Sequence, residues 1–460
     1  MKIIILGAGQ VGTSITEILS REAGGDITLI DLDEERLSLL QNRFDIRTVH
    51  GHASHPDVLR EAGCDDAELI LAVTNSDETN ITACPIASIL FNTPKKIARI
   101  RSTRYTSEDK LFAKDGSGLG VDYIISPEQI VTTELQRLIE RPGALQVLDF
   151  ANGRIQLVAI KAYDDGPLVG HQLRELKDHL SNIETRVVAI YRKGEAIMPC
   201  GDTTIKVNDE VFFIAATEHI RDVMSEMRKL DKPVRTIMLA GGGNIGFRLA
   251  EALEQKNYKV KLIESSPERA EEISNHLKNT IVLIGDSADE DLLKMENIHK
   301  TDVFCAITND DEANILSAML AKQLGARRVM SIVNRTAYAD LIERTMIDIA
   351  YSPKQATIGS VLPKFRTGAL EAVHSLRLGT AEAIEAIALN DQSSKVVGRQ
   401  IDQIPLPKGT IIGAILRDEE VIIPHHDTVI VNEDHLILFV QEKKHIDEVV
   451  ALFQVSPFFI

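Results

Sequence analysis

The same glycine pattern occurs twice in this chain, and the repeat constrains the fold more than any other feature. IIILGAGQVG at 3–12 and IMLAGGGNIG at 237–246 each place G-x-G-x-x-G directly after an apolar run. Two further pairs of stretches match in the same order: ILAVTNSDETNITA at 70–83 with FCAITNDDEANILS at 304–317, and LVGHQL at 168–173 with VVGRQI at 396–401. Ordered matches of this kind indicate that the 460 residues form two copies of one design.

The first part of each copy alternates short apolar runs with helical patterns. In the first copy KIIIL, ITLID, IRTVHG and LILAV have the character of strands, and SITEILSREA and PDVLREAG lie between them with a helical pattern. Strands that alternate with helices predict parallel βαβ units. We therefore expect an α/β protein with two Rossmann-like, doubly wound parallel sheets, each followed by a small α+β domain.

The tetrapeptides SPEQ at 126–129 and SPKQ at 352–355 mark where the first part of each copy ends. Serine, a proline at the next position and a glutamine three residues after the serine match a capping box with proline at the first helical position, so a linking helix should begin at each. Six segments are expected: Rossmann domains at 1–126 and 233–352, linking helices at 127–141 and 353–368, and small domains at 142–232 and 369–460.

The glycine loops predict nucleotide binding at the start of each copy. In such a loop the first glycine allows a tight turn, the second lets a pyrophosphate approach the backbone, and the third allows close helix packing. An acidic residue follows at the end of the next strand, Asp31 and Glu264, where a ribose hydroxyl would bind. The candidate cofactor-binding residues of the loops are Gly7, Gly9, Gln10, Val11, Gly12, Gly241, Gly243, Asn244, Ile245 and Gly246. The alternative is that these glycines serve packing alone.

The copies differ after their fifth strands. The first has Arg99 and Arg101 in IARIR, whereas the second has Ile332 and Asn334 in MSIVN. Arginines at the carboxyl end of a strand can bind phosphates in a bidentate manner, so the first site should accept more phosphate charge than the second. The alternative is that both arginines form ion pairs within an acidic surface.

Two further groups of polar residues follow strands. Thr74 and Thr308 end the fourth strands and Asp77 and Asp311 come next, so that these residues could cap the following helix, contact a ligand, or do both. His50, His52 and His55 cluster at the end of the third strand of the first copy, where His50 and His52 alternate along the strand and no cysteine or carboxylate set completes a metal site. Solvated or ligand-edge histidines are favoured over metal ligands there.

Charge and the lack of certain segments narrow the class of protein. A formal net charge of −17 repels phosphate backbones and anionic lipids, so nucleic-acid binding and general membrane adhesion are not expected. No run approaches the roughly 18 apolar residues of a spanning helix. No export signal is visible, and four separated cysteines offer no disulfide framework. A cytosolic protein is expected.

No catalytic constellation accompanies the glycine loops. A dehydrogenase needs an acid or base against its substrate beside the nicotinamide, and the small domains, duplicated with little shared polar identity, provide no clear candidate. The nucleotide is therefore expected to be sensed and not consumed. Two alternatives are an oxidoreductase with tandem Rossmann domains and a scaffold whose Rossmann sites are vestigial.

Taken together, the paired loops, the T-[ND]-x-D-E-x-N stretch, the linking helix and the small VG-x-x-L domain resemble paired RCK domains of the regulatory subunits of bacterial Trk potassium-uptake systems. The resemblance spans essentially the whole chain. It implies a non-enzymatic cytosolic ring on the inner face of the membrane that gates an integral-membrane potassium transporter subunit (TrkH- or TrkG-like). The ring would be a homo-oligomer, expected to be a tetramer, with NAD(H) or ATP/ADP as regulatory ligands.

The resemblance also implies which residues line the nucleotide. They are Gly7, Gly9, Gly12, Asp31, Ala53, Thr74 and Arg99 in the first copy, and Gly241, Gly243, Gly246, Glu264, Asp286 and Thr308 in the second. His52 stands where the family has an aspartate, and Ile332 stands where it has an arginine.

The first linking helix carries a broad apolar stripe made of Ile130, Val131, Leu135, Leu138 and Ile139. One small domain should not need so wide a stripe, so we expect a partner surface that couples the ring to the nucleotide. The alternative is simple packing onto the chain's own sheet.

Overall fold

The computed structural model describes residues 1–22, 26–113, 118–181, 183–227, 232–335, 338, 342, 346–365, 369–376, 380–390 and 394–454. They form two compact units. The first contains residues 1–130 and 356–361, and the second contains residues 131–355 and 362–460.

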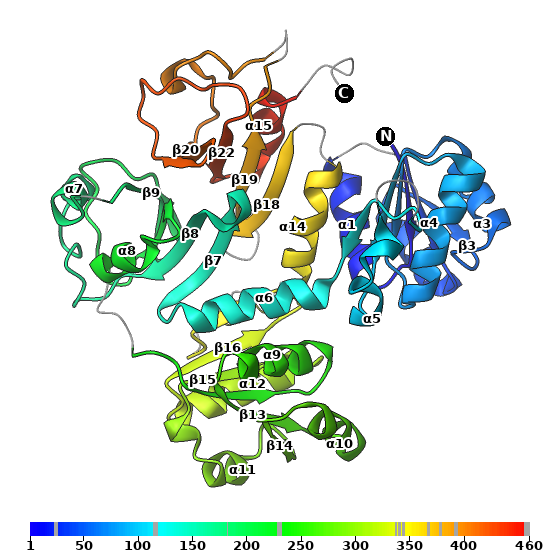
Figure 1. Ribbon diagram of the computed structural model, residues 1–460, viewed down its shortest axis with the longest axis horizontal. Helices are drawn as coiled ribbons and strands as arrows, with labels where there is room; N and C mark the ends of the chain where they lie inside the picture. The colour runs from blue at the N-terminus through cyan, green and yellow to red at the C-terminus, as the bar shows by residue number, and fades with distance from the viewer. Residues whose placement is uncertain are drawn as a thin grey trace. The chain divides into compact units, whose positions relative to one another are not determined.

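A six-stranded parallel sheet in the order β3-β2-β1-β4-β5-β6 forms the first unit, with helices on both of its faces (Figure 1). Its strands are β1 (Lys2–Leu6), β2 (Asp26–Asp31), β3 (Arg47–His50), β4 (Leu69–Ala72), β5 (Lys95–Arg99) and β6 (Tyr123–Ile125). Its helices are α1 (Gln10–Glu22), α2 (Glu34–Arg43), α3 (Pro56–Glu61), α4 (Asp77–Phe91) and α5 (Thr103–Thr106). The apolar runs of β1 and β4 are buried because helices cover both faces of a parallel sheet.

The second unit contains a sheet of the same design, in the order β14-β13-β12-β15-β16-β17. Its strands are β12 (Thr236–Ala240), β13 (Lys259–Glu264), β14 (Ile281–Ile284), β15 (Val303–Ala306), β16 (Arg328–Ile332) and β17 (Ile349–Tyr351). The helices between them include α9 (Asn244–Gln255), α10 (Pro267–His276), α11 (Glu290–Met295) and α12 (Asp311–Gln323). The predicted pair of doubly wound sheets is confirmed.

The small domains, also in the second unit, are built on antiparallel five-stranded sheets in the orders β10-β9-β11-β8-β7 and β18-β19-β22-β20-β21. The strands are β7 (Ala144–Phe150), β8 (Ile155–Lys161), β9 (Thr185–Arg192), β10 (Glu195–Ile197), β11 (Glu210–Ala216), β18 (Leu370–Leu376), β19 (Ala381–Ile387), β20 (Thr410–Arg417), β21 (Glu420–Ile422) and β22 (His435–Val440). Short helices α7 (Leu176–His179), α8 (Ile220–Met227) and α15 (Ile446–Leu452) accompany them. One apolar core joins the two sheets and includes Phe212 and Phe439, whose ring centroids lie 6.4 Å apart.

The linking helices α6 (Pro127–Glu140) and α14 (Pro353–Phe365) begin at the two predicted prolines. Residues 366–368, which were expected to continue the second of these helices, lie outside the described part of the chain. No helix among the described residues is both long enough and apolar enough to cross a membrane.

The apolar stripe of α6 is covered by the chain itself. Val131, Leu135, Leu138 and Ile139 are at most 2% exposed and belong to the same core cluster as β12 of the second parallel sheet. Arg328 of β16 donates to the carbonyl oxygen of Leu138 over 3.3 Å, which satisfies a carbonyl in the last turn of the helix. The expectation that these residues form a partner surface is therefore wrong, and packing onto the chain's own sheet is what occurs.

Candidate functional site

The candidate residues of the first copy meet at one edge of its sheet. The glycine loop follows β1, Asp31 ends β2, Ala53 follows β3, Thr74 follows β4 and Arg99 ends β5. The strand order reverses between β1 and β4, and in open α/β sheets ligands bind in the crevice at such a switch point. In the second copy, Glu264, Asp286 and Thr308 lie at the matching edge.

Each of the three glycines in a loop is required for a different structural reason. Gly7 has a φ of +104°, and a Cβ on Gly12 would lie 1.8 Å from the carbonyl oxygen of Gly7. A Cβ on Gly9 would meet nothing within 4 Å, so packing does not explain this glycine. The second loop repeats the pattern: Gly241 has a φ of +113°, a Cβ on Gly246 would lie 1.9 Å from the Gly241 oxygen, and one on Gly243 would be unobstructed. The open positions are where a pyrophosphate would approach the backbone.

The acidic residues brace the glycine loops from the neighbouring strand. Asp31 accepts a bond from the N–H of Ala8 at 2.5 Å through Oδ2 and one from the N–H of Asp33 at 2.9 Å through Oδ1. Glu264 accepts from the N–H of Gly242 at 2.8 Å. Each carboxylate oxygen has lone pairs to spare, so a ribose hydroxyl could still be bound. This bracing role was not foreseen from the sequence.

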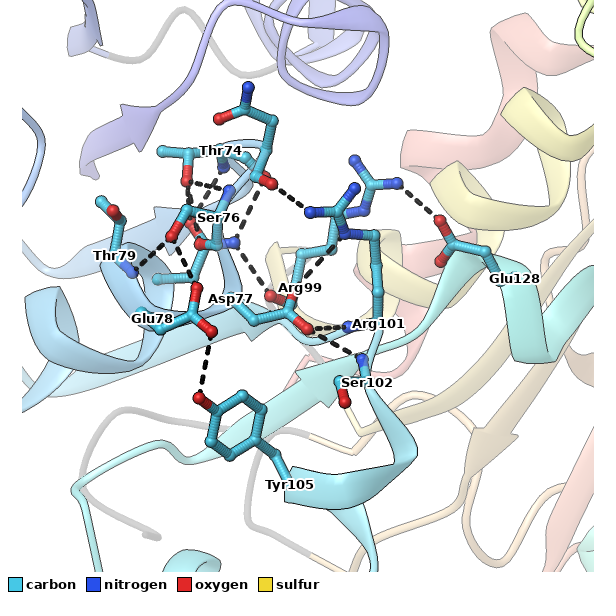
Figure 2. Close-up of polar contacts among 12 residues, drawn as sticks. Thr74, Ser76, Asp77, Glu78, Thr79, Arg99, Arg101, Ser102, Tyr105 and Glu128 are labelled. Atoms are coloured by element: carbon cyan, nitrogen blue, oxygen red, sulfur yellow. Dashed lines mark hydrogen bonds and ion pairs between the residues drawn. The ribbon is translucent and has the colours of Figure 1, made fainter. Parts of the chain in front are cut away.

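Helix α4 begins at Asp77, one residue earlier than a cap at Asp77 would require. Its N-cap is Ser76, whose Oγ accepts from the N–H of Thr79 at 3.1 Å (Figure 2). In the second copy the N-cap of α12 is Asp310, which accepts from the N–H of Ala313 at 2.8 Å. The interpretation of Thr74, Asp77, Thr308 and Asp311 as capping residues is therefore wrong.

Asn80 ties the ends of two strands together. Its Oδ1 accepts from the N–H of Thr74 at 2.9 Å, and its Nδ2 donates to the carbonyl oxygen of Arg99 at 2.9 Å. Asn314 makes the matching bonds to Thr308 at 2.8 Å and to Ile332 at 3.2 Å. Both asparagines are fully buried. Their recurrence in the aligned stretches was the available signal for this role.

Asp77 holds the loop that follows β5. Its Oδ2 accepts from the N–H groups of Arg101 at 2.9 Å and Ser102 at 2.8 Å (Figure 2). Asp311 accepts in the same way from Asn334 at 2.9 Å and from Arg335 at 2.9 Å. Together with the asparagines, these aspartates fix the backbone on the β4–β5 side of each crevice.

Both arginines of the first crevice form ion pairs within the protein, as the alternative interpretation proposed. Arg99 contacts Glu128, in the first turn of α6, with Nη2 2.8 Å from Oε1 (Figure 2). Arg101 contacts Asp77 with Nε 3.4 Å from Oδ1. Within the described structure, Nε of Arg99 and Oε2 of Glu128 are buried without a hydrogen-bond partner. The second copy has Ile332 at the position of the first arginine.

The histidines at the end of β3 and in the loop after it do not form one cluster, because His50 contacts the backbone while His52 and His55 contact each other. Nε2 of His50 lies 3.0 Å from the carbonyl oxygen of Leu32. Nδ1 of His52 lies 3.0 Å from Oγ of Ser54, and its ring centroid lies 4.7 Å from that of His55. Across the described ranges, no group of three or more histidine, cysteine or acidic side chains is arranged to hold a metal ion.

Comparison with known proteins gives full-length matches. The TrkA-N domain model matches residues 3–127 and 237–353, and the TrkA-C domain model matches residues 157–228 and 385–454. The chain is 55% identical to the Trk system potassium uptake protein TrkA of Vibrio alginolyticus over 461 residues, covering 100% of both chains. It is 48% identical to the protein of that name from Haemophilus influenzae, again with 100% of both chains covered.

Solved structures share the fold at low identity. The GsuK RCK domain aligns with a TM-score of 0.62 and 18% identity, covering 98% of this chain and 95% of that chain. The GsuK channel bound to NAD aligns with a TM-score of 0.62 and 17% identity, covering 98% of this chain and 79% of that one. At this identity the likeness shows the fold alone.

Proposed function

This chain belongs to the TrkA family of Trk system potassium uptake proteins, and from that membership we propose that it senses nucleotides and regulates a potassium-uptake system. The observation that carries the proposal is the pair of glycine loops at the switch points of the two parallel sheets. Each loop has an unobstructed second glycine, Gly9 or Gly243, and accepts a brace from the carboxylate that ends the second strand, which supports binding of a pyrophosphate and a ribose there. Segments 1–126 and 233–352 would be the nucleotide-binding domains.

The ligands we propose are adenine nucleotides, NAD(H) or ATP/ADP, bound as regulators. Phosphates would lie at the glycine loops and the ribose at Asp31 or Glu264. The remaining residues proposed to line the ligands are Gly7, Gln10, Val11, Gly12, Ala53, Thr74, Arg99, Gly241, Asn244, Ile245, Gly246, Asp286 and Thr308. One solved neighbour of the same fold is a GsuK channel bound to NAD.

The polar groups of the crevices suit binding and not turnover. Asp31 and Glu264 already accept backbone N–H bonds, and Arg99 and Arg101 are held in ion pairs. A general acid or base needs a proton that it can exchange with a substrate, and these groups are committed to holding loops. We therefore propose a regulator without catalytic activity.

A route for coupling runs through Glu128. This residue pairs with Arg99 of the crevice and lies in the first turn of α6, whose later residues belong to the core of the second unit. A phosphate that draws Arg99 away would release the start of this helix. A ligand that prefers one arrangement can shift the assembly by about 1–3 kcal/mol of coupling free energy per site.

The target would be an integral-membrane potassium transporter subunit of the TrkH or TrkG type. A homo-oligomeric ring, proposed to be a tetramer, would bind this subunit at the cytoplasmic face of the membrane. A ring fits the mechanism because several equivalent crevices then act on one pore.

The test is nucleotide binding by the full chain together with potassium uptake. Calorimetry with NAD, NADH, ATP and ADP should detect binding that is lost in the double variant Gly9→Asp, Gly243→Asp. Aspartate is a favourable residue at the start of a helix, and its Cβ meets nothing, so the fold should survive while phosphate is repelled. In cells lacking their own regulatory subunit, the double variant should fail to restore uptake. Equal binding by both chains would refute the proposal.

A further inference from the structure

The loops after β3 and β14 share one backbone conformation but carry different side chains. The first reads Gly51-His52-Ala53-Ser54-His55, and the second reads Gly285-Asp286-Ser287-Ala288-Asp289. Matching N–H groups donate to matching carbonyl oxygens: Gly51 to Asp31 at 3.0 Å, Gly285 to Glu264 at 3.0 Å, His55 to His52 at 3.0 Å and Asp289 to Asp286 at 3.1 Å. Two histidines therefore occupy the places of two aspartates.

The second residue of each loop uses one side-chain atom to close the turn. Oδ1 of Asp286 accepts from the N–H of Ala288 at 2.9 Å. Nδ1 of His52 accepts from the N–H of Ser54 at 3.4 Å. A ring nitrogen that accepts from a backbone N–H carries no proton, so the neutral ring has its proton on Nε2.

The two loops therefore offer opposite hydrogen-bonding groups with the atom that remains. Asp286 has Oδ2, which only accepts, and its side chain is exposed. His52 has Nε2–H, which donates, and its side chain is half-buried. A ligand group that suits one loop does not suit the other.

Strand order indicates which part of a nucleotide would reach these loops. The phosphates bind after β1 and the ribose binds at the end of β2, and the next strand outward is β3. In the parallel pair of β2 and β3, Asp31 lies opposite His50, two residues before His52. In the second copy Glu264 lies opposite Ile284, two residues before Asp286. The part of the nucleotide that follows the ribose in this direction is the base, so the base would reach the loops after β3 and β14.

The fifth loop residue reinforces the difference. Asp289 caps α11 by accepting from Asp291 at 2.9 Å and from Leu292 at 3.2 Å. His55 occupies the N-cap position of α3 without a side-chain cap bond, and its ring stacks on His52 at 4.7 Å. The stack holds the His52 ring in place, and the exchange removes two carboxylates from this edge of the first crevice.

We propose that His52 and Asp286 give the two crevices different selectivity for the base of the nucleotide. Asp286 accepts from an exocyclic amino group such as that of adenine, and it opposes a purine with a carbonyl oxygen at the same position. His52 donates, so it accommodates the carbonyl-bearing purine. The inference rests on the proposed nucleotide binding and deepens it.

The experiment compares NAD with nicotinamide hypoxanthine dinucleotide, in which a carbonyl oxygen replaces the amino group. In the full chain, Gly243→Asp blocks the second crevice so that binding to the first can be measured alone. Gly9→Asp blocks the first crevice so that binding to the second can be measured alone. The second crevice should bind the hypoxanthine form at least about tenfold more weakly than NAD, because an acceptor would face an acceptor. The first crevice should show a difference below about threefold in the same direction, or the reverse preference.

Matched variants at position 52 separate polarity from shape. Asparagine and aspartate have nearly the same shape, and both can accept from Ser54, but asparagine presents a donor and aspartate an acceptor. His52→Asn should keep the tolerance of the first crevice, whereas His52→Asp should create discrimination of about tenfold. Asp286→Asn should abolish the discrimination between NAD and the hypoxanthine form in the second crevice. Thermal melting checks that each variant folds.

The outcomes distinguish this inference from the proposed function. If neither crevice binds NAD or ATP, the proposed function fails and the inference falls with it. If NAD binds but both crevices discriminate equally, or if His52→Asp and Asp286→Asn leave the ratios unchanged, the inference alone is overturned. The expected pattern is discrimination that follows the residue at this loop position.

Discussion

Asp31 accepts a hydrogen bond from the backbone N–H of Ala8, with Oδ2 2.5 Å from the nitrogen. The carboxylate at the end of β2 thus fixes the glycine loop after β1 and also occupies the position that binds a ribose in dinucleotide folds. Glu264 repeats the relationship with Gly242 at 2.8 Å. In each copy one carboxylate therefore shapes the glycine loop from the position at which dinucleotide folds bind a ribose.

This double role predicts strong discrimination against a 2′-phosphate. The first crevice, isolated with Gly243→Asp, should bind NADH at least about tenfold more tightly than NADPH, because the phosphate would meet the Asp31 carboxylate. Asp31→Asn should weaken NADH binding and narrow the difference between the two cofactors. Calorimetry with both cofactors measures this. If the Gly243→Asp chain, which keeps Asp31, binds NADPH more tightly than NADH, the prediction is contradicted.

The ion pair between Arg99 and Glu128 predicts a competition between phosphate and helix α6. Glu128→Gln should raise the affinity of the first crevice for ATP by about three- to tenfold, because the arginine no longer leaves a carboxylate partner. Arg99→Ile, which copies the second crevice, should lower ATP binding more than NADH binding. If Glu128→Gln leaves ATP affinity unchanged while Arg99→Ile lowers it, the arginine binds phosphate without leaving its pair.

The sequence predicted both parallel sheets because the relevant signals are local. Apolar runs, helical periodicity and glycine spacing place β1, the loop and α1 without knowledge of the rest of the fold. The cap of α4 was misplaced because Ser76 and Asp77 are adjacent and both can cap, and only the backbone decides where the helix begins. The partner of Arg99 could not be predicted, since Glu128 lies 29 positions away and meets it only in the folded chain.

The surface that buries the apolar stripe of α6 could not be predicted from the sequence, for a related reason. The periodicity of Val131, Leu135 and Leu138 shows that one face of the helix is buried, but it does not say against what. The covering surface comes from β12 and β16, about a hundred residues or more further along the chain. The sequence repeat predicted that this second sheet exists. Only the structure shows that the first linking helix packs against it.

Asn80 predicts a stability effect that nucleotide binding does not explain. Asn80→Ala would leave the part-buried N–H of Thr74 and carbonyl oxygen of Arg99 without their partner, which should cost about 2–4 kcal/mol of unfolding free energy. Ser76→Ala, which removes only a helix cap, should cost about 1 kcal/mol. Thermal melting without ligand measures both. Equal losses for the two variants would show that Asn80 does not tie the strands together.

A buried ionisable cluster in the second unit predicts an unusual dependence of stability on pH. Arg137 of α6 pairs with Glu134 at 2.8 Å and also contacts Asp149 of β7, while the ring of His374 in β18 packs edge-on against Phe150 at 5.0 Å. Burial raises the pKa of Glu134 to about 7, with Arg137 opposing the shift. Burial lowers the pKa of His374 to about 4, and Arg137 lowers it further.

The two shifts act in opposite directions. The folded-state pKa of Glu134 lies above its ordinary value of 4.5, so its contribution is fully present below that pH and is lost as pH rises through about 7. The folded-state pKa of His374 lies below its ordinary value of 6.5, so its contribution is present above that pH and is lost as pH falls through about 4. Between pH 4.5 and 6.5 these effects partly cancel.

Removing one group should therefore expose the slope of the other. In Glu134→Gln the melting temperature should rise more steeply with pH between about 4.5 and 6.5 than in the parent chain, because the opposing effect of Glu134 is then absent. In His374→Gln the melting temperature should fall relative to that of the parent chain over the same range, because the opposing effect of His374 is then absent. Melting curves at half-unit steps, taken without ligand, give both slopes relative to the parent. Parallel profiles for the parent and both variants would mean that neither group changes its protonation on folding, and the buried charges of this cluster would then have no effect on pH stability.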